Sequence, residues 1–233
     1  MRRFGEERAF DVLCGEYVFE QSMQTTPSLE EKAIRLVTER ITGHRDGLPH
    51  IPTSTHSLRV YASVKEWSAA MQLSSDCSLA ALLHDILEDG GVIVQELAAE
   101  GFTARTIELV ELCSHEETDL GSEARWTLMI AKLIKANDRE AWAIKVADLL
   151  DNLKESSALG ELRQRFMVGV KAELLLRLTA GLLQNQPLWL ALAAEANYQA
   201  KSLLPLDGYW IAPQPAGLTF SEHEFLGKPA KDV

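Results

Sequence analysis

The sequence predicts an all-α protein. Apolar residues recur at spacings of three and four along nearly the whole chain, which is the period of a helix that buries one face. No long segment alternates apolar and polar residues in the manner of a half-buried strand. Hydrophobic residues make up 46% of the chain and charged residues 24%, the balance of an ordinary globular protein. With 233 residues, the chain is long enough to bury a sizeable helical core.

Start and stop signals divide this pattern into individual helices. Ser28 stands three residues before Glu31, and Asp138 precedes an apolar run, as capping residues do. Gly160 separates two apolar segments, as a glycine at the end of a helix does. The expected helices cover about 4–20, 29–43, 56–73, 76–89, 92–100, 103–114, 122–136, 138–156, 159–184 and 187–203.

We expect one helical domain over residues 1–203. Residues 44–55 join two helices and contain glycine, proline and threonine, so they are predicted to form a loop. A helical hairpin rich in leucine and alanine is expected at about 159–203, where it either packs on the other helices or forms a homodimer face. Residues 204–233 carry four prolines and are expected to form an extended tail.

Composition excludes several classes of function. The net charge of −11 argues against a broad nucleic-acid interface, because phosphate contacts need clustered lysine and arginine. No apolar run reaches the roughly 18 residues of a membrane span, and the basic start of the chain turns acidic before any apolar stretch, unlike a signal peptide. The three widely spaced cysteines are interpreted as reduced thiols of a cytoplasmic protein: Cys14, Cys77 and Cys113.

The most informative segment is HDILED, which interrupts a strongly apolar run. It places His84, Asp85, Glu88 and Asp89 within two helical turns. Burying an unpaired charge is costly, so such groups must be paired or must bind a metal. The alternative is a helix end at which Glu88 and Asp89 face water, although acids are unfavourable at a helix C-terminus.

Two further segments carry isolated polar groups. Asp148 interrupts the apolar run AIKVADLLDNL with Asn152 one turn later, and His56 begins another helix. Each alone has an ordinary structural interpretation, such as a hydrogen-bonded buried acid or a solvated histidine. Together with His84 and Asp85 they make a set of nitrogen and oxygen ligands suited to Mn²⁺, Fe²⁺ or Zn²⁺.

The order of His56, His84-Asp85 and Asp148 resembles the HD superfamily of metal-dependent phosphohydrolases. The segment HDILED looks like the HDxxED motif of the RelA/SpoT-type hydrolase domain, and KVADLLDN is similar to that family's KLADxxxN stretch. The loop HRDGLP resembles the family's approach to its first histidine, with Arg45 one place late. The resemblance covers about residues 30–160, which would form the HD core.

This resemblance implies a fold, an activity and residue roles. It implies an HD-type helical bundle that removes pyrophosphate from the 3′ position of guanosine tetra- and pentaphosphate with a divalent metal, in this family Mn²⁺. Glu88 and Asp89 would orient or deprotonate the attacking water. The metal ligands would be His56, His84, Asp85 and Asp148. Substrate contacts would come from Arg45 and Asn152, and contacts from Lys145 and His115 are also considered.

The sequence departs from the family where the base is expected to be recognised. The loop before His56 is about three residues longer, with His50 in place of the usual tyrosine. Asp151 replaces a histidine, Lys154 an arginine and Glu155 a threonine. Two other functions therefore stay open: an HD nucleotidase or phosphomonoesterase acting on a different nucleotide, and a degenerate HD domain that binds a nucleotide without turnover. The tryptophans at 67, 126, 142, 189 and 210 are interpreted as packing residues.

Overall fold

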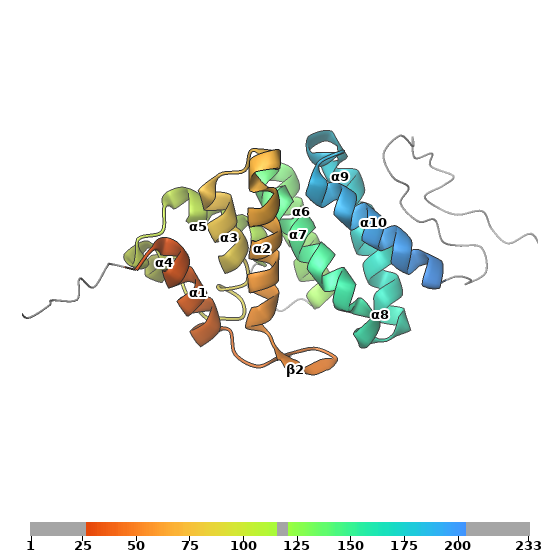
Figure 1. The fold of residues 1–233 in the computed structure, drawn as a ribbon, viewed down its shortest axis with the longest axis horizontal. Helices are drawn as coiled ribbons and strands as arrows, with labels where there is room; N and C mark the ends of the chain where they lie inside the picture. The colour runs from red at the N-terminus through yellow and green to blue at the C-terminus, as the bar shows by residue number, and fades with distance from the viewer. Residues whose placement is uncertain (1–26, 116–120, 204–233) are drawn as a thin grey trace, which may run out of the picture.

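A computed structural model describes residues 27–115 and 121–203, and within them the protein is a bundle of helices with one short hairpin (Figure 1). The all-α prediction is confirmed. The expected helix at 4–20 and the tail at 204–233 lie outside the described residues. In chain order the elements are α1 (Leu29–Arg40), β1 (His44–Arg45), β2 (Leu48–Pro52), α2 (Ser54–Met71), α3 (Ser75–Leu83), α4 (Val94–Glu100), α5 (Ala104–Cys113), α6 (Ser122–Ala136), α7 (Arg139–Glu155), the 3₁₀ helix η1 (Ser156–Leu159), α8 (Glu161–Phe166), the π-helix η2 (Met167–Ala172), α9 (Glu173–Leu183) and α10 (Pro187–Ser202).

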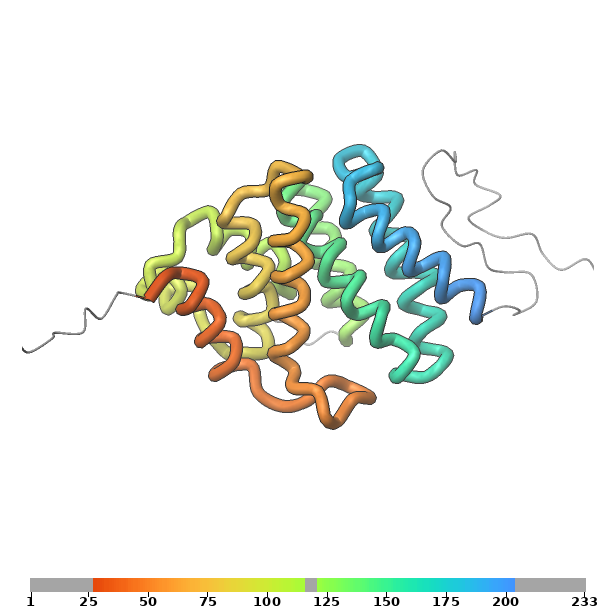
Figure 2. Tube along the Cα trace, viewed as in Figure 1, coloured from red at the N-terminus to blue at the C-terminus, as the bar shows by residue number. Residues whose placement is uncertain are grey.

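Helix α7 is the centre of the bundle. Every residue from Ala141 to Asp151 is buried, so this stretch of the helix has no solvent-exposed face. Helices α2, α3 and α5 pack on it from one side and α9 and α10 from the other, as the traces in Figures 1 and 2 show. The polar side chains that α7 carries at Lys145, Asp148 and Asp151 are therefore buried and need partners.

Capping fixes where several helices begin. Ser28 and Glu31 form a reciprocal capping box at α1, and Asp138 accepts hydrogen bonds from the amides of Glu140 and Ala141 at α7. The C-terminal helices are tied to the bundle by Gln199 of α10, which donates to the carbonyl of Leu153 at 2.5 Å. Within the described residues, no helix combines the length and apolar character that crossing a membrane requires.

Three predicted elements were wrong in detail. The loop expected at 44–55 contains an antiparallel hairpin in which Arg45 pairs with Leu48. The helix expected at 76–89 ends at Leu83, because the amide of Ile86 bonds the Leu83 carbonyl three residues back and tightens the chain into turns. The helix expected at 159–184 is interrupted by the π-helix of η2.

The β1–β2 hairpin packs closely against η1 at Gly47, where any other residue would be strained. Gly47 has φ of +70°, and a Cβ atom there would lie 2.6 Å from the carbonyl oxygen of Ala158. We expect Gly47→Ala to lower the free energy of unfolding by about 2 kcal/mol or more, because left-handed backbone costs roughly 1–2 kcal/mol for other residues and the clash adds to it. Urea denaturation measures the change.

The matched control is Gly91→Ala. Gly91 also has positive φ, at +59°, but an added Cβ would meet nothing within 4 Å. If both variants lose the same stability, the hairpin does not rest on η1.

Candidate metal centre

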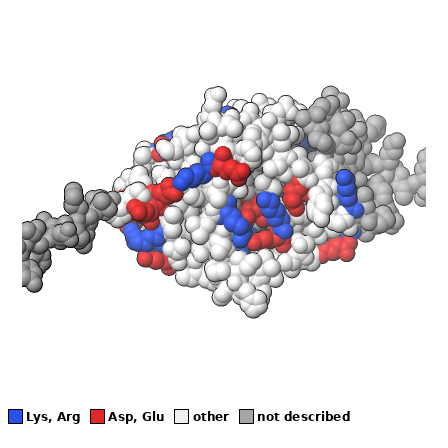
Figure 3. Space-filling view, in the orientation of Figure 1, with Lys and Arg blue, Asp and Glu red and all other residues white. Residues whose placement is uncertain are grey.

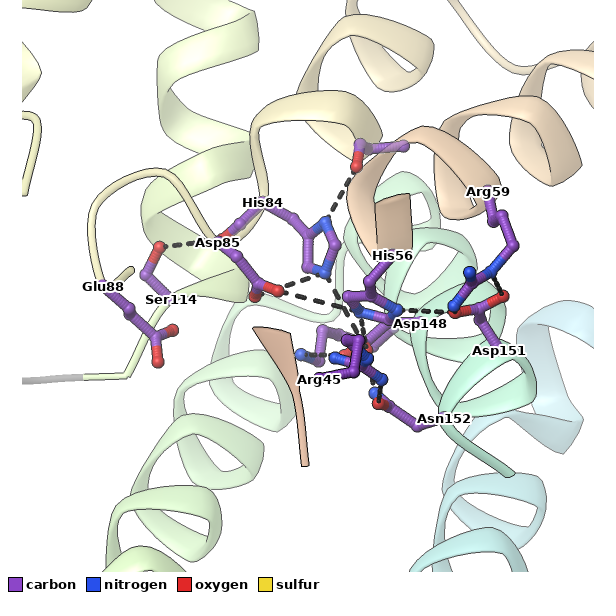
Figure 4. Close-up of polar contacts among 12 residues, drawn as sticks. Arg45, His56, Arg59, His84, Asp85, Glu88, Ser114, Asp148, Asp151 and Asn152 are labelled. Atoms are coloured by element: carbon purple, nitrogen blue, oxygen red, sulfur yellow. Dashed lines mark hydrogen bonds and ion pairs between the residues drawn. The ribbon is translucent and has the colours of Figure 1, made fainter. Parts of the chain in front are cut away.

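Three segments far apart in the chain bring two histidines and two aspartates together. His56 comes from the first turn of α2, His84 and Asp85 directly follow α3, and Asp148 lies in the middle of α7. Both imidazoles are buried, whereas the Asp85 side chain is 23% exposed. Figure 4 shows these side chains converging on one small region between the three segments.

The ligand atoms are close enough to share one ion. Atoms of His56, His84 and Asp85 all lie within 4.8 Å of one another. The Nε2 atom of His84 is 3.2 Å from Asp85 Oδ1. Asp148 Oδ1 is 3.1 Å from His56 Nε2 and 3.8 Å from His84 Nε2. The structure thus brings together all four residues that the sequence predicts as ligands.

Hydrogen bonds on the far side of each ring decide which nitrogen faces this region. His84 Nδ1 donates to the carbonyl of Ala81 at 2.8 Å, so Nε2 of the neutral ring carries a lone pair. That Nε2 is buried and has no hydrogen-bond partner. His56 Nδ1 contacts Asp151 Oδ2 at 2.7 Å, which likewise directs its Nε2 inward. Two oriented imidazole nitrogens and two carboxylates fit a divalent transition metal.

Asp151 belongs to a charged network that the sequence analysis missed. Arg59 donates to both of its oxygens, at 2.7 and 2.9 Å, and also to Glu155 at 2.5 Å. Figure 4 shows Arg59 and Asp151 on the side of His56 that faces away from His84. The available signal was the spacing: Asp151 follows Asp148 by three residues and Arg59 follows His56 by three, so each pair shares a helix face.

Arg45 and Asn152, which were predicted to contact substrate, bond each other. Arg45 donates to Asn152 Oδ1 at 2.6 Å and to Glu155 Oε2 at 2.9 Å, and Asn152 donates to Asp148 Oδ1 at 2.5 Å. Lys145 is buried and paired with Asp148. These three side chains therefore adjoin the metal centre and are held by internal partners.

The two acids predicted to act on water follow α3 and have different surroundings. Glu88 accepts hydrogen bonds from the His115 amide at 2.7 Å and from His115 Nδ1 at 2.5 Å. It lies apart from the histidine pair in Figure 4. Partial burial, together with the nearby charges of Asp85 and Glu88, raises the pKa of Asp89 to about 6.

A cavity of about 1020 Å³ opens onto this region. Among the predicted site residues it is lined by all except His84, which lies buried behind them. Trp126 also lines the cavity, so its interpretation as a packing residue was incomplete, whereas Trp142 and Trp189 are buried in the core. On the face shown in Figure 3, acidic and basic side chains are interspersed, without one large basic patch.

The protonation of His56 makes the stability of the metal-free protein depend on pH. Burial lowers the pKa of His56, but hydrogen bonds to Asp148 and Asp151 raise it to about 9, above its ordinary value of 6.5. Protonation of His56 therefore contributes its full stabilisation of the folded state below pH 6.5, and this contribution is lost as the pH rises through 9. At 1.36 kcal/mol per pKa unit it amounts to about 3 kcal/mol at most.

Denaturation in the presence of a chelator between pH 6 and 10 measures this effect. The wild type should lose stability across that range relative to His56→Gln, which cannot take up the proton. Parallel pH profiles for the two proteins would contradict the assignment.

Comparisons with known proteins agree with this architecture. Residues 53–153, which include all four predicted ligands, match the family model of the HD domain. Residues 53–153 therefore form an HD domain, and for this segment the predicted resemblance to the HD superfamily is confirmed.

A solved structure has a similar fold, with a TM-score of 0.63 and 23% sequence identity, over 77% of this chain and 99% of that chain. It is described as a metazoan ortholog of SpoT that hydrolyzes ppGpp and plays a role in starvation responses. No curated protein matches the chain.

Proposed function

We propose that the protein is a metal-dependent phosphohydrolase acting on a phosphorylated nucleotide. The observation that carries this proposal is the convergence of His56, His84, Asp85 and Asp148, in which the buried Nε2 of His84 has a lone pair and no hydrogen-bond partner. A degenerate HD domain that does not bind metal would gain nothing from leaving this atom unsatisfied.

These four residues would hold one divalent cation, and Mn²⁺ is our first choice, with Fe²⁺ and Zn²⁺ also compatible with the ligand set. Such an ion supplies Lewis-acid chemistry, because it polarises a phosphoryl oxygen and makes water a better nucleophile. The Asp151 carboxylate and the Ala81 carbonyl keep the two histidines oriented, and the cavity admits a nucleotide-sized molecule.

Asp89 is the better placed of the two acids to accept a proton from the attacking water. Its pKa of about 6 lies near neutral pH, where a general base works efficiently. Glu88 accepts two hydrogen bonds from His115, so it is better suited to fixing His115 against the turn after α3.

We propose pyrophosphate removal from the 3′ position of guanosine tetra- or pentaphosphate as the leading reaction. The HDILED segment supports it, as does the likeness in fold to the SpoT-related structure. One observation favours an alternative nucleotide: Arg45 and Asn152, expected to contact substrate, are bonded to each other and to internal acids. A nucleotidase or phosphomonoesterase is therefore the second candidate.

A panel of nucleotides with Mn²⁺ tests these assignments. Pyrophosphate released from ppGpp supports the leading reaction, and inorganic phosphate released from nucleoside monophosphates supports the alternative. If metal-loaded protein binds nucleotides and forms no product from any of them, the proposed hydrolase activity is wrong.

Asp151 is proposed to position His56 for the metal. We expect Asp151→Ala to weaken metal affinity by about 10- to 100-fold, the usual cost of removing a carboxylate that orients a ligating histidine. Isothermal titration with Mn²⁺ gives the affinity. Glu66→Ala, an exposed acid on the same helix as His56, serves as the control and should bind metal like the wild type. An unchanged affinity in Asp151→Ala would exclude the positioning role.

A further inference from the structure

One wall of the cavity combines two cations with a tryptophan ring, and it is made by elements that do not contribute to the metal centre. Trp126 comes from α6, Arg163 from α8 and Lys171 from the π-helix η2, and all three line the cavity. Lys171 Nζ lies 5.1 Å from the centre of the Trp126 ring and 5.8 Å from that of Phe166. The Arg163 guanidinium lies 6.0 Å from the Phe166 ring. Cation–π contacts hold these groups in place.

Among the described residues, few acids compensate the positive charge on this wall. The cavity cations Arg45 and Lys145 are paired with Glu155 and Asp148. Over residues 27–115 and 121–203, Lys171 forms no ion pair, and Arg163 has a loose one of 3.7 Å with Glu123. Burial and the charge of Arg163 lower the pKa of Lys171 to about 8. A half-buried ammonium beside a second cation is stabilised by an anion.

The backbone places Lys171 for such a contact. The π-helical segment Met167–Ala172 interrupts the helical run between α8 and α9, and π-bulges of this kind are frequent at functional sites. Asp148 and Lys145 line the same cavity as Lys171, so this wall and the metal centre face one shared space. One molecule in the cavity can therefore reach both regions.

We propose that Lys171 and Arg163, beside Trp126, form a second anion subsite that holds a phosphate group of the substrate other than the one that is cleaved. This inference rests on the proposed function and deepens it. The substrate class is a nucleotide phosphorylated at two separate positions, with one phosphate at the metal centre and the other at this wall. A nucleotide with a single phosphorylated position would leave the subsite empty.

Binding of two probes that differ by one phosphate tests the subsite without turnover. Isothermal titration in Mn²⁺ compares guanosine 3′,5′-bisphosphate with guanosine 3′-monophosphate, while phosphate release is monitored. We expect the wild type to bind the bisphosphate about 10- to 100-fold more tightly than the monophosphate. This is the gain in affinity expected from one charge-assisted hydrogen bond. Lys171→Met should reduce this ratio to within about twofold and leave monophosphate affinity unchanged, while Lys171→Arg should retain it.

Lys135→Met, an exposed lysine of α6 outside the cavity, is the matched control and should keep the full ratio. Arg163→Met serves as a second variant should Lys171→Met fail to fold, because Arg163 is 43% exposed. A ratio near one in the wild type, a ratio unaffected by both variants, or no binding of either probe overturns the subsite.

The two proposals fail in different ways. If no nucleotide is hydrolysed but the binding ratio still depends on Lys171, the subsite stands and the proposed hydrolase activity does not. If ppGpp is hydrolysed with the same kcat/KM by the wild type, Lys171→Met and Arg163→Met, and the ratio is unaffected, the hydrolase stands and the subsite is wrong.

Discussion

Asp85→Ala is expected to lose the divalent ion and to lower phosphohydrolase activity by more than about 100-fold. Partners that only orient a ligand are already worth about 10- to 100-fold, so the loss of a direct ligand should exceed that range. Asp85 Oδ1 lies 3.2 Å from His84 Nε2 and Oδ2 lies 3.7 Å from His56 Nε2, so the carboxylate bridges the two imidazoles. The metal content of the purified variant measures the loss of the ion. Its initial rate on the nucleotide that the wild type hydrolyses in the panel measures the loss of activity.

Glu66→Ala provides the control for a simple loss of negative charge, because Glu66 is exposed on α2 and does not line the cavity. It should retain one ion per chain and full activity. Asp85→Ala protein that is folded by circular dichroism and still carries one tightly bound ion would show that the cluster is not the metal centre.

Asp89→Asn is expected to lower kcat by about 10²- to 10⁴-fold with little change in metal content. The range is that of a lost general base. Asparagine preserves the size and shape of the side chain and can still form hydrogen bonds, but its amide cannot accept the proton of the attacking water. Asp89 lines the cavity with Asp85, and it stands outside the set of four predicted ligands. Steady-state kinetics with metal analysis of the same preparation separate the two properties.

The comparison with Glu88→Gln makes this prediction specific. Glu88 accepts two hydrogen bonds from His115, so the glutamine should mainly disturb the placement of His115 and reduce kcat less than Asp89→Asn does. If Glu88→Gln is the more damaging variant while metal content is equal, the roles of the two acids are reversed.

Local sequence was sufficient to predict helices, because their apolar periodicity and their caps are properties of neighbouring residues. The box at Ser28 and Glu31 and the cap at Asp138 are present where the sequence indicates them. The same reasoning failed at Gly47, where the hairpin depends on a close approach to the distant Ala158. It also extended α3 past Leu83, since the turns that follow are set by the packing of Ile86 in the core and not by any helix-breaking residue before Gly90.

The sequence by itself determined the helical class, the presence of an HD domain and the chemical types of four candidate ligands. The helical class follows from periodicity, and the candidate ligands follow from polar residues placed in apolar runs, which have few ways of being satisfied. The HD domain was expected from the resemblance of the segments HDILED and KVADLLDN to that family. Only the tertiary structure decided that Asp151 faces His56, that Arg45 and Asn152 bond each other, and that Lys171 shares a cavity with Asp148. Such pairings join residues on different helices, and they depend on how the helices pack around α7, which no local pattern specifies.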